Sequence, residues 1–181
     1  MSVVVLMLRG INLGAGRRVA MGDLRDALAA AGLRDVRTHG QSGNVVARSE
    51  LEPDAVADPA RRAIADRFGL DVPVVARAPA QLALVVERNP LRAVATDPRR
   101  HQVSFLSDPL TPAVAERLVA LAVEPEAIAI QGREIHAWHP NGVARSKLWS
   151  ALAGPGLGVT ATARNWTTVT TMLAMSTEME G

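Results

Sequence analysis

The sequence predicts an α+β protein built from two tandem ferredoxin-like subdomains, each with the element order βαββαβ, plus extra helices. Two observations lead to this fold class. Apolar runs of strand length alternate with segments of helical periodicity in that order, and the second half of the 181-residue chain repeats the order of the first. We therefore expect subdomain 1 with a trailing helix over residues 1–88, a linker over 89–101, and subdomain 2 with a C-terminal helix over 102–181.

The first half opens with a continuous apolar run, which is typical of a central strand buried on both faces. In the following helix, Leu24, Ala27 and Leu28 recur at helical spacing. Asp58-Pro59 suits the N-cap and first position of the second helix, and Gly69 suits its end. The predicted elements are a strand over 3–8, a helix over 21–31, strands over 36–39 and 44–48, a helix from 58 to 69, a strand over 72–76 and a helix over 79–87.

The second half follows the same plan. Thr111-Pro112 opens its first helix, and two short strands flank a Gln-Gly-Arg turn as a hairpin. Ser146 is a suitable N-cap for the helix that follows the hairpin. The predicted elements are a strand over 103–106, a helix from 111, strands over 127–130 and 134–138, a helix over 146–152, a weak strand over 158–163 and a helix from 167 to about 176.

The composition excludes several classes of protein. A hydrophobic content of 48% with 21% charged residues is normal for a soluble globular chain, and the net charge of +2 is close to neutral. The absence of cysteine excludes disulfides, thiol catalysis and cysteine-based zinc sites. No apolar run approaches the ~20 residues that span a membrane, and the N-terminus lacks the pattern of a signal peptide. We expect a cytoplasmic protein without membrane contact.

Three polar islands interrupt this apolar chain, at residues 8–18, 40–44 and 162–168, and a fourth polar segment, 141–147, precedes a helix. They are rich in Gly, Asn, Ser, Thr and Arg, which offer backbone amides, neutral hydrogen bonds and fixed positive charge but little proton transfer. This chemistry favours the binding of a small anionic ligand. The candidate ligand-binding residues are Arg9, Asn12, Gln41, Ser42, Asn44, Ser146, Lys147, Arg164 and Asn165.

The first island resembles a dinucleotide-binding loop only in part. A strand leads into Gly14-Ala15-Gly16 and then a helix, but the fingerprint needs a third small residue where this chain has Val19. The glycines are explained more simply by a turn. An anion nest that uses the loop amides with Arg17 and Arg18 stays open as an alternative.

No residue is assigned a catalytic role. His39 is the histidine best placed to act as a general base, although a half-exposed strand histidine is the simpler interpretation. His136 and His139 fall on a predicted strand and turn, where they would point to opposite faces, so we expect no metal site. The sequence indicates no cofactor, and whether the protein is an enzyme is left undecided.

These motifs together resemble the DUF1697 family of uncharacterised bacterial proteins. The likeness covers the segment from Leu8 to Gly14, Gln41-Ser42-Gly43-Asn44, Asn141-Gly142, Ser146-Lys147-Leu148 and the segment from Thr160 to Trp166. It implies a duplicated ferredoxin-like α/β fold and implies no activity. The family usually carries an aromatic residue where this chain has His39, which weakens the case for a base there.

We expect a protein that binds a phosphate- or carboxylate-bearing ligand in a pocket where the two subdomains meet. Two alternatives belong to other classes. A nucleic-acid-binding module is disfavoured because aromatic residues make up only 3% of the chain, and recognition sheets of that kind stack bases on exposed aromatics. A structural or assembly protein without a small ligand is the third hypothesis, and the sequence gives no oligomeric state.

Overall fold

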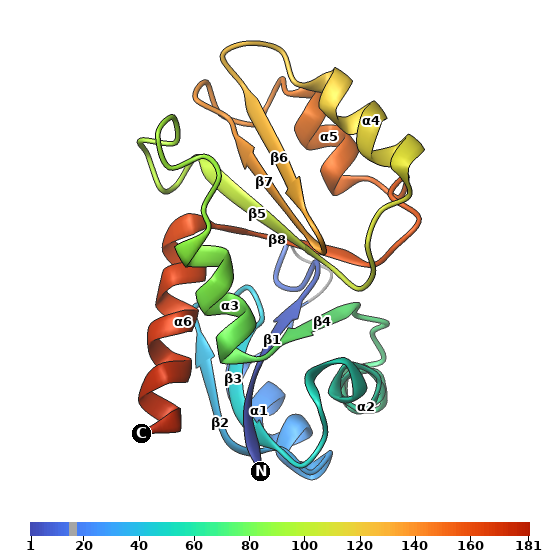
Figure 1. Ribbon diagram of the computed structural model, residues 1–181. Coiled ribbons are helices and arrows are strands. Elements are labelled where there is room, and N and C mark those ends of the chain that lie inside the picture. The colour runs from blue at the N-terminus through green and yellow to red at the C-terminus, as the bar shows by residue number, and fades with distance from the viewer. Residues whose placement is uncertain (15–17) are drawn as a thin grey trace. The chain divides into compact units, whose positions relative to one another are not determined.

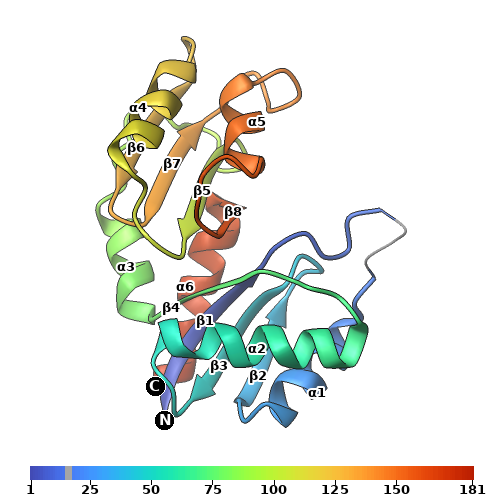
Figure 2. The same cartoon turned by 90° about the vertical axis from the view of Figure 1, so that its right-hand side faces the viewer.

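The computed structural model describes residues 1–14 and 18–181, which form two compact units, residues 1–83 with 171–181 and residues 84–170. Each unit contains a four-stranded antiparallel sheet with helices (Figures 1 and 2). The predicted α+β class with two ferredoxin-like subdomains is confirmed. Within the described residues, no helix combines the length and apolar character needed to cross a membrane.

The first sheet has the strand order β2-β3-β1-β4, in which the apolar β1 lies at the centre and pairs with both β3 and β4. Helices α1 and α2 cover one face, where Leu6, Leu24 and Ile64 are fully buried in one core. On the other face, Arg48 of β3 donates a hydrogen bond to the carbonyl of Met179 near the C-terminus. The elements of this part are β1 (Ser2–Leu8), α1 (Met21–Ala30), β2 (Arg34–His39), β3 (Asn44–Ser49), α2 (Pro53–Phe68), β4 (Val74–Arg77) and α3 (Pro79–Glu87), which continues into the second unit.

The second sheet repeats this topology with the order β6-β7-β5-β8, again with its first strand at the centre. Helices α4 and α5 cover one face, where Leu118, Ile135 and Leu148 are buried together. Figure 1 shows these two helices side by side, in agreement with their direct contacts. The elements are β5 (His101–Leu106), α4 (Pro112–Leu121), β6 (Ala127–Gln131), β7 (Glu134–Trp138), α5 (Lys147–Ala153), β8 (Ala161–Asn165) and α6 (Trp166–Glu180).

The register of the second sheet places polar side chains on the face away from α4 and α5. Val103 pairs with His136 on one side and with Arg164 on the other, so these three residues share one face. Ile135, one residue away from His136, belongs to the core under the helices. The alternation along the strands therefore separates an apolar face from a face with buried polar groups.

Helix α2 corrects the predicted start at Asp58-Pro59. It begins at Pro53 after the N-cap Glu52, and Pro59 lies inside the helix. Val56, Ala60 and Ile64 form one buried stripe that runs across Pro59. An interior proline costs ~3 kcal/mol, whereas full burial of side chains such as Val and Ile contributes roughly 1.5–3 kcal/mol each. The continuous apolar stripe therefore outweighs the local proline signal.

The last strand of each sheet begins two to three residues later than predicted. Pairing of β4 starts where Val74 faces Leu8, because Pro73 has no N–H for the ladder and offers only its carbonyl, to Arg9 N. Pairing of β8 starts at Ala161, since Gly158 has a φ of 74° that a strand does not accept. Helix α6 is also longer than predicted, extending to Glu180.

Candidate functional site

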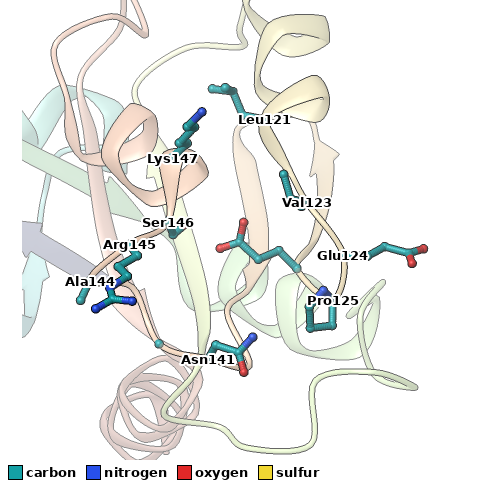
Figure 3. A pocket seen from close by; sticks show the side chains of 11 residues that line it. Leu121, Val123, Glu124, Pro125, Asn141, Ala144, Arg145, Ser146 and Lys147 are labelled. Atoms are coloured by element: carbon teal, nitrogen blue, oxygen red, sulfur yellow. The ribbon is translucent and has the colours of Figure 1, made fainter.

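An open cavity of about 590 Å³ lies in the second unit between two segments that are separated in the sequence by a hairpin. One wall is formed by the end of α4 and the residues that lead into β6, and the other by the loop that leads into α5 (Figure 3). The cavity size falls in the range of small-molecule sites. The lining residues are Leu121, Val123, Glu124, Pro125, Glu126, Asn141, Gly142, Ala144, Arg145, Ser146 and Lys147.

Three polar side chains tie the two walls together. His139 Nδ1 lies 2.7 Å from Glu126 Oε1 and 3.3 Å from Ser146 Oγ. Because a carboxylate only accepts, the ring N–H donates to Glu126. Ser146 Oγ also accepts a hydrogen bond of 2.9 Å from Trp149 N, which makes it the N-cap of α5, as predicted. The cluster therefore fixes the loop before α5 against the segment before β6.

This cluster does not have the geometry of a catalytic triad. In a triad, the carboxylate and the nucleophile occupy opposite nitrogens of the imidazole ring, so that the ring relays a proton. Here Glu126 and Ser146 both approach Nδ1. The other nitrogen, His139 Nε2, is buried and has no hydrogen-bond partner in the part of the chain that the structure describes. The arrangement holds the loop and supplies no poised nucleophile.

Glu126 contributes a negative charge to the cavity. Burial alone raises the pKa of the Glu126 carboxyl, but hydrogen bonds from Ser146 and His139 together outweigh burial. The pKa of Glu126 is therefore below its ordinary value, and the group is ionised at neutral pH. His139 and Ser146 already donate hydrogen bonds to the Glu126 carboxylate, so its negative charge is partly compensated within the wall.

Two cations stand on the opposite wall. Arg145 and Lys147 both line the cavity and are exposed to solvent. Neither side chain forms an ion pair or hydrogen bond with any residue in the ranges 1–14 and 18–181. Lys147 is the single lysine of the sequence. Solvated cations that line one cavity offer charge-assisted hydrogen bonds to an oxygen-rich anion.

The candidate residues of the first unit act mainly in local structure. Asn12 Nδ2 donates to the carbonyls of Val19 (2.9 Å) and Gln41 (2.7 Å), and its Oδ1 accepts from Val19 N at 2.7 Å. Asn44 is buried and donates to the His39 carbonyl at 3.0 Å. Asn12 thus joins the first two islands within one unit.

The remaining positions of the first unit are more open. The side chains of Gln41 and Ser42 are exposed, and Arg9 is half-buried. Arg17, proposed with Arg18 for an anion nest, lies outside the described residues. The expectation that all the islands share one cavity stays a prediction, because the candidate residues are divided between the two units.

The last two candidates belong to β8. Arg164 is buried on the sheet face away from α4 and α5, where it donates to Thr162 Oγ1 at 2.7 Å and to the Ala163 carbonyl at 2.8 Å. Burial lowers the pKa of Arg164 to about 10. Asn165 Oδ1 accepts from Thr168 N at 2.9 Å and so acts as a cap at the start of α6.

A buried histidine pair on the same sheet face is absent from the sequence-based candidates. His101 Nε2 lies 3.2 Å from His136 Nδ1, and the ring of Trp166 stacks on His101 with centroids 4.6 Å apart. Burial lowers the pKa of each histidine to about 4, and for His136 the nearby His101 adds to the effect. Both rings are therefore neutral at pH 7. In the part of the chain that the structure describes, no group of three or more His, Asp or Glu residues lies close enough to hold a metal.

The sequence analysis also missed the wall formed by Leu121, Val123 and Glu126. Leu121 is the last residue of α4 and packs partly against the core of the second unit. No local motif marks the residues that follow it. Arg145, adjacent to the predicted Ser146 and Lys147, carried the one usable signal, which is a second cation in the same loop.

The comparisons with known proteins identify a family and a fold. The family model described as "Protein of unknown function (DUF1697)" matches residues 1–136, and the chain belongs to this family. A solved structure, the conserved bacterial protein SP0830 from Streptococcus pneumoniae, is similar to this chain with a TM-score of 0.77 at 20% sequence identity. The likeness covers 97% of this chain and 98% of that one, and it extends to the fold alone. The search of curated proteins finds no match.

Proposed function

We propose that this member of the DUF1697 family binds a small phosphate- or carboxylate-bearing ligand in the cavity of its second unit. The observation that carries the proposal is the presence of Arg145 and Lys147 on one cavity wall, both solvated and without an ion pair among the described residues. Lys147 is retained from the sequence-based candidates, and Arg145 is added to them. The proposal concerns binding and assigns no reaction.

The charges of the cavity support an anion more than a cation. Glu126 is the acidic group of the lining that has hydrogen-bond donors of its own, from His139 and Ser146. Glu124 also lines the cavity, but Figure 3 shows its carboxylate directed away from the loop that carries the cations. Arg145 and Lys147 have no carboxylate partner among the described residues, so an incoming anion gains contacts that the protein alone does not make. Two charge-assisted hydrogen bonds at about 1.5–3 kcal/mol each support dissociation constants on the order of millimolar.

The other hypotheses receive less support from the described residues. The strand aromatics Phe105 and Trp138 are buried, so neither ring is available to stack on a base. An assembly role requires a large apolar surface. The exposed apolar side chains that line the cavity lie opposite the two cations, so they do not form a purely apolar surface of that kind. The nucleic-acid alternative predicts a distinct outcome in the same experiment.

The test is a titration of the protein with inorganic phosphate, acetate and a short oligonucleotide, followed by ¹⁵N-resolved NMR. We expect phosphate or acetate to shift the backbone amides of Asn141, Gly142 and Lys147, and Lys147→Ala and Arg145→Ala each to weaken binding about tenfold. Arg88→Ala is the matched control, because Arg88 is an exposed arginine outside the cavity. Shifts spread over the surface and equal in all variants would refute the proposal, and tight, salt-sensitive binding of the oligonucleotide would favour the nucleic-acid alternative.

We also propose that the two subdomains derive from one duplicated unit. The same strand order in both sheets supports this, and so does the register, since Leu8 faces Val74 as Leu106 faces Ala161, three residues before Arg77 and Arg164 respectively. Both arginines are buried and donate to the carbonyl of the preceding residue at 2.8 Å. An experimental structure in which the two sheets superpose only with a shifted register would contradict a common origin.

A further inference from the structure

The cavity of the second unit has walls of opposite character. The wall after α4 contributes Leu121, Val123 and Pro125, whereas the loop before α5 contributes Asn141 and the cations. Figure 3 shows the side chains from Leu121 to Pro125 on one segment and those from Asn141 to Lys147 on the other. A ligand that fills the cavity therefore meets apolar surface on one side and positive charge on the other.

The apolar wall is unusually exposed for its composition. Val123 is 67% exposed, although valine is among the residue types most often buried. It does not belong to the core under α4 and α5, whereas the neighbouring Leu121 packs partly against that core. Exposed apolar surface of this kind at the edge of a cavity gains free energy when a ligand covers it.

We infer that the ligand is an amphiphilic anion, an oxygen-rich acidic head joined to an apolar chain of several carbons. This inference rests on the proposed function and adds the chemical class of the ligand. The head binds Lys147 and Arg145, and the chain lies against Val123 and Leu121. A plain inorganic anion uses only one wall, and a neutral apolar molecule uses only the other.

Charge complementarity selects this occupant over a purely apolar one. Placing an uncharged chain in the cavity covers the Val123 wall but separates two cations from water without compensation. An anionic head replaces that water with charge-assisted hydrogen bonds. The opposite arrangement, a cationic head, meets Glu126, whose carboxylate already accepts a hydrogen bond of 2.7 Å from His139, and Glu124, whose carboxylate Figure 3 shows directed away from the opposite wall.

The test compares acetate, hexanoate and 1-hexanol as probes, with dissociation constants from NMR titration of the full chain. Each methylene removed from water tightens binding about fourfold, so burial of about half of the added chain makes hexanoate at least tenfold tighter than acetate. Hexanol, which lacks the charge, binds at least tenfold more weakly than hexanoate. The shifts of both acids centre on Asn141 and Gly142.

Val123→Ser tests the apolar wall directly, since an exposed side chain tolerates this change without loss of folding. We expect it to weaken hexanoate about fourfold and to leave acetate unchanged. Val94→Ser is the matched control, because Val94 is also an exposed valine of this unit but lies outside the cavity.

The outcomes separate the inference from the proposed function. If acetate and hexanoate bind equally well at the cavity, the anion site stands and the amphiphilic class is overturned. If hexanol binds as tightly as hexanoate, or if neither acid binds, the cations contribute nothing and the proposed function fails together with the inference. Equal loss of hexanoate binding in the Val123 and Val94 variants would also overturn the role assigned to the apolar wall.

Discussion

Acidification from pH 7.5 to 5.5 is expected to destabilise the protein through the buried pair His101 and His136. The two rings are 1% and 0% exposed and 3.2 Å apart, and burial lowers the pKa of each to about 4. Arg164 shares the sheet face with His136, so a proton on this pair also meets a positive neighbour across Val103. The folded state therefore resists protonation that the unfolded chain accepts.

The sign and size follow from the two pKa values. An unfolded histidine titrates near 6.5, above the folded value of about 4, so the stabilisation is complete above pH 6.5 and is lost as the pH falls from 6.5 towards 4. At pH 5.5 the unfolded state gains about 1.4 kcal/mol per histidine relative to the folded state, or about 3 kcal/mol for both. This figure changes little for any folded pKa below 5. It is a large fraction of the 5–15 kcal/mol that stabilise a typical domain.

The assay is urea unfolding at pH 7.5, 6.5 and 5.5, monitored by circular dichroism and fluorescence. The double variant His101→Gln/His136→Gln is the matched comparison, because glutamine keeps hydrogen-bonding capacity but does not titrate. We expect the wild-type free energy of unfolding to fall by about 3 kcal/mol more than that of the variant over this range. If the two proteins lose stability in parallel, within about 0.5 kcal/mol, the histidine pair is not the source and the reasoning from burial is wrong.

Three further predictions concern stability and use thermal or urea unfolding. Gly43→Ala should cost about 3 kcal/mol, because the residue has a φ of 75° and its new Cβ would lie 2.5 Å from Leu8 Cβ. Gly40→Ala is the control and should cost only about 1 kcal/mol, because Gly40 has a φ of 61° but open space around its Cβ position. Equal losses in the two variants would contradict the packing argument. Ser146→Ala should cost about 1–2 kcal/mol by removing the cap of α5 and one donor to Glu126, whereas Ser150→Ala on the same helix should cost less than half as much. Asn165→Ala should cost about 1 kcal/mol by removing the cap at Thr168 N, and Asn165→Asp should restore most of it; failure of that rescue would exclude capping as the cause.

The sequence was a reliable guide where local patterns and burial agree. The spacing of Leu24, Ala27 and Leu28 predicts α1 correctly because the same three side chains enter the core. The hairpin around Gly132 is also confirmed. Gly132 has a φ of 58°, which glycine adopts without steric cost, and β6 and β7 pair on either side of it. The prediction failed at Pro59, where a local signal competed with an apolar stripe that begins at Val56.

The cavity was only half predictable for a reason of chain topology. Its walls come from the segments 121–126 and 141–147, and the β6–β7 hairpin that separates them in sequence brings them together in space. The loop before α5 carries a motif, because a cap and two cations stand close together. The opposite wall has no motif, since its contribution is the exposure of Val123, and exposure is a property of the folded chain.

The polar islands also combine two kinds of residue that composition does not separate. Short side chains such as those of Asn12, Ser146 and Asn165 satisfy backbone groups one turn away, and helix caps and tight turns require them whether or not a ligand binds. The two long cations of the candidate set have different surroundings. The register buries Arg164 on one face of the sheet, where it donates to the Ala163 carbonyl, and the loop leaves Lys147 in solvent. A cation that lines a cavity, and that neither a backbone group nor a carboxylate engages, is therefore the more discriminating mark of a ligand site in this chain, and Lys147 with Arg145 meets that criterion within the described residues.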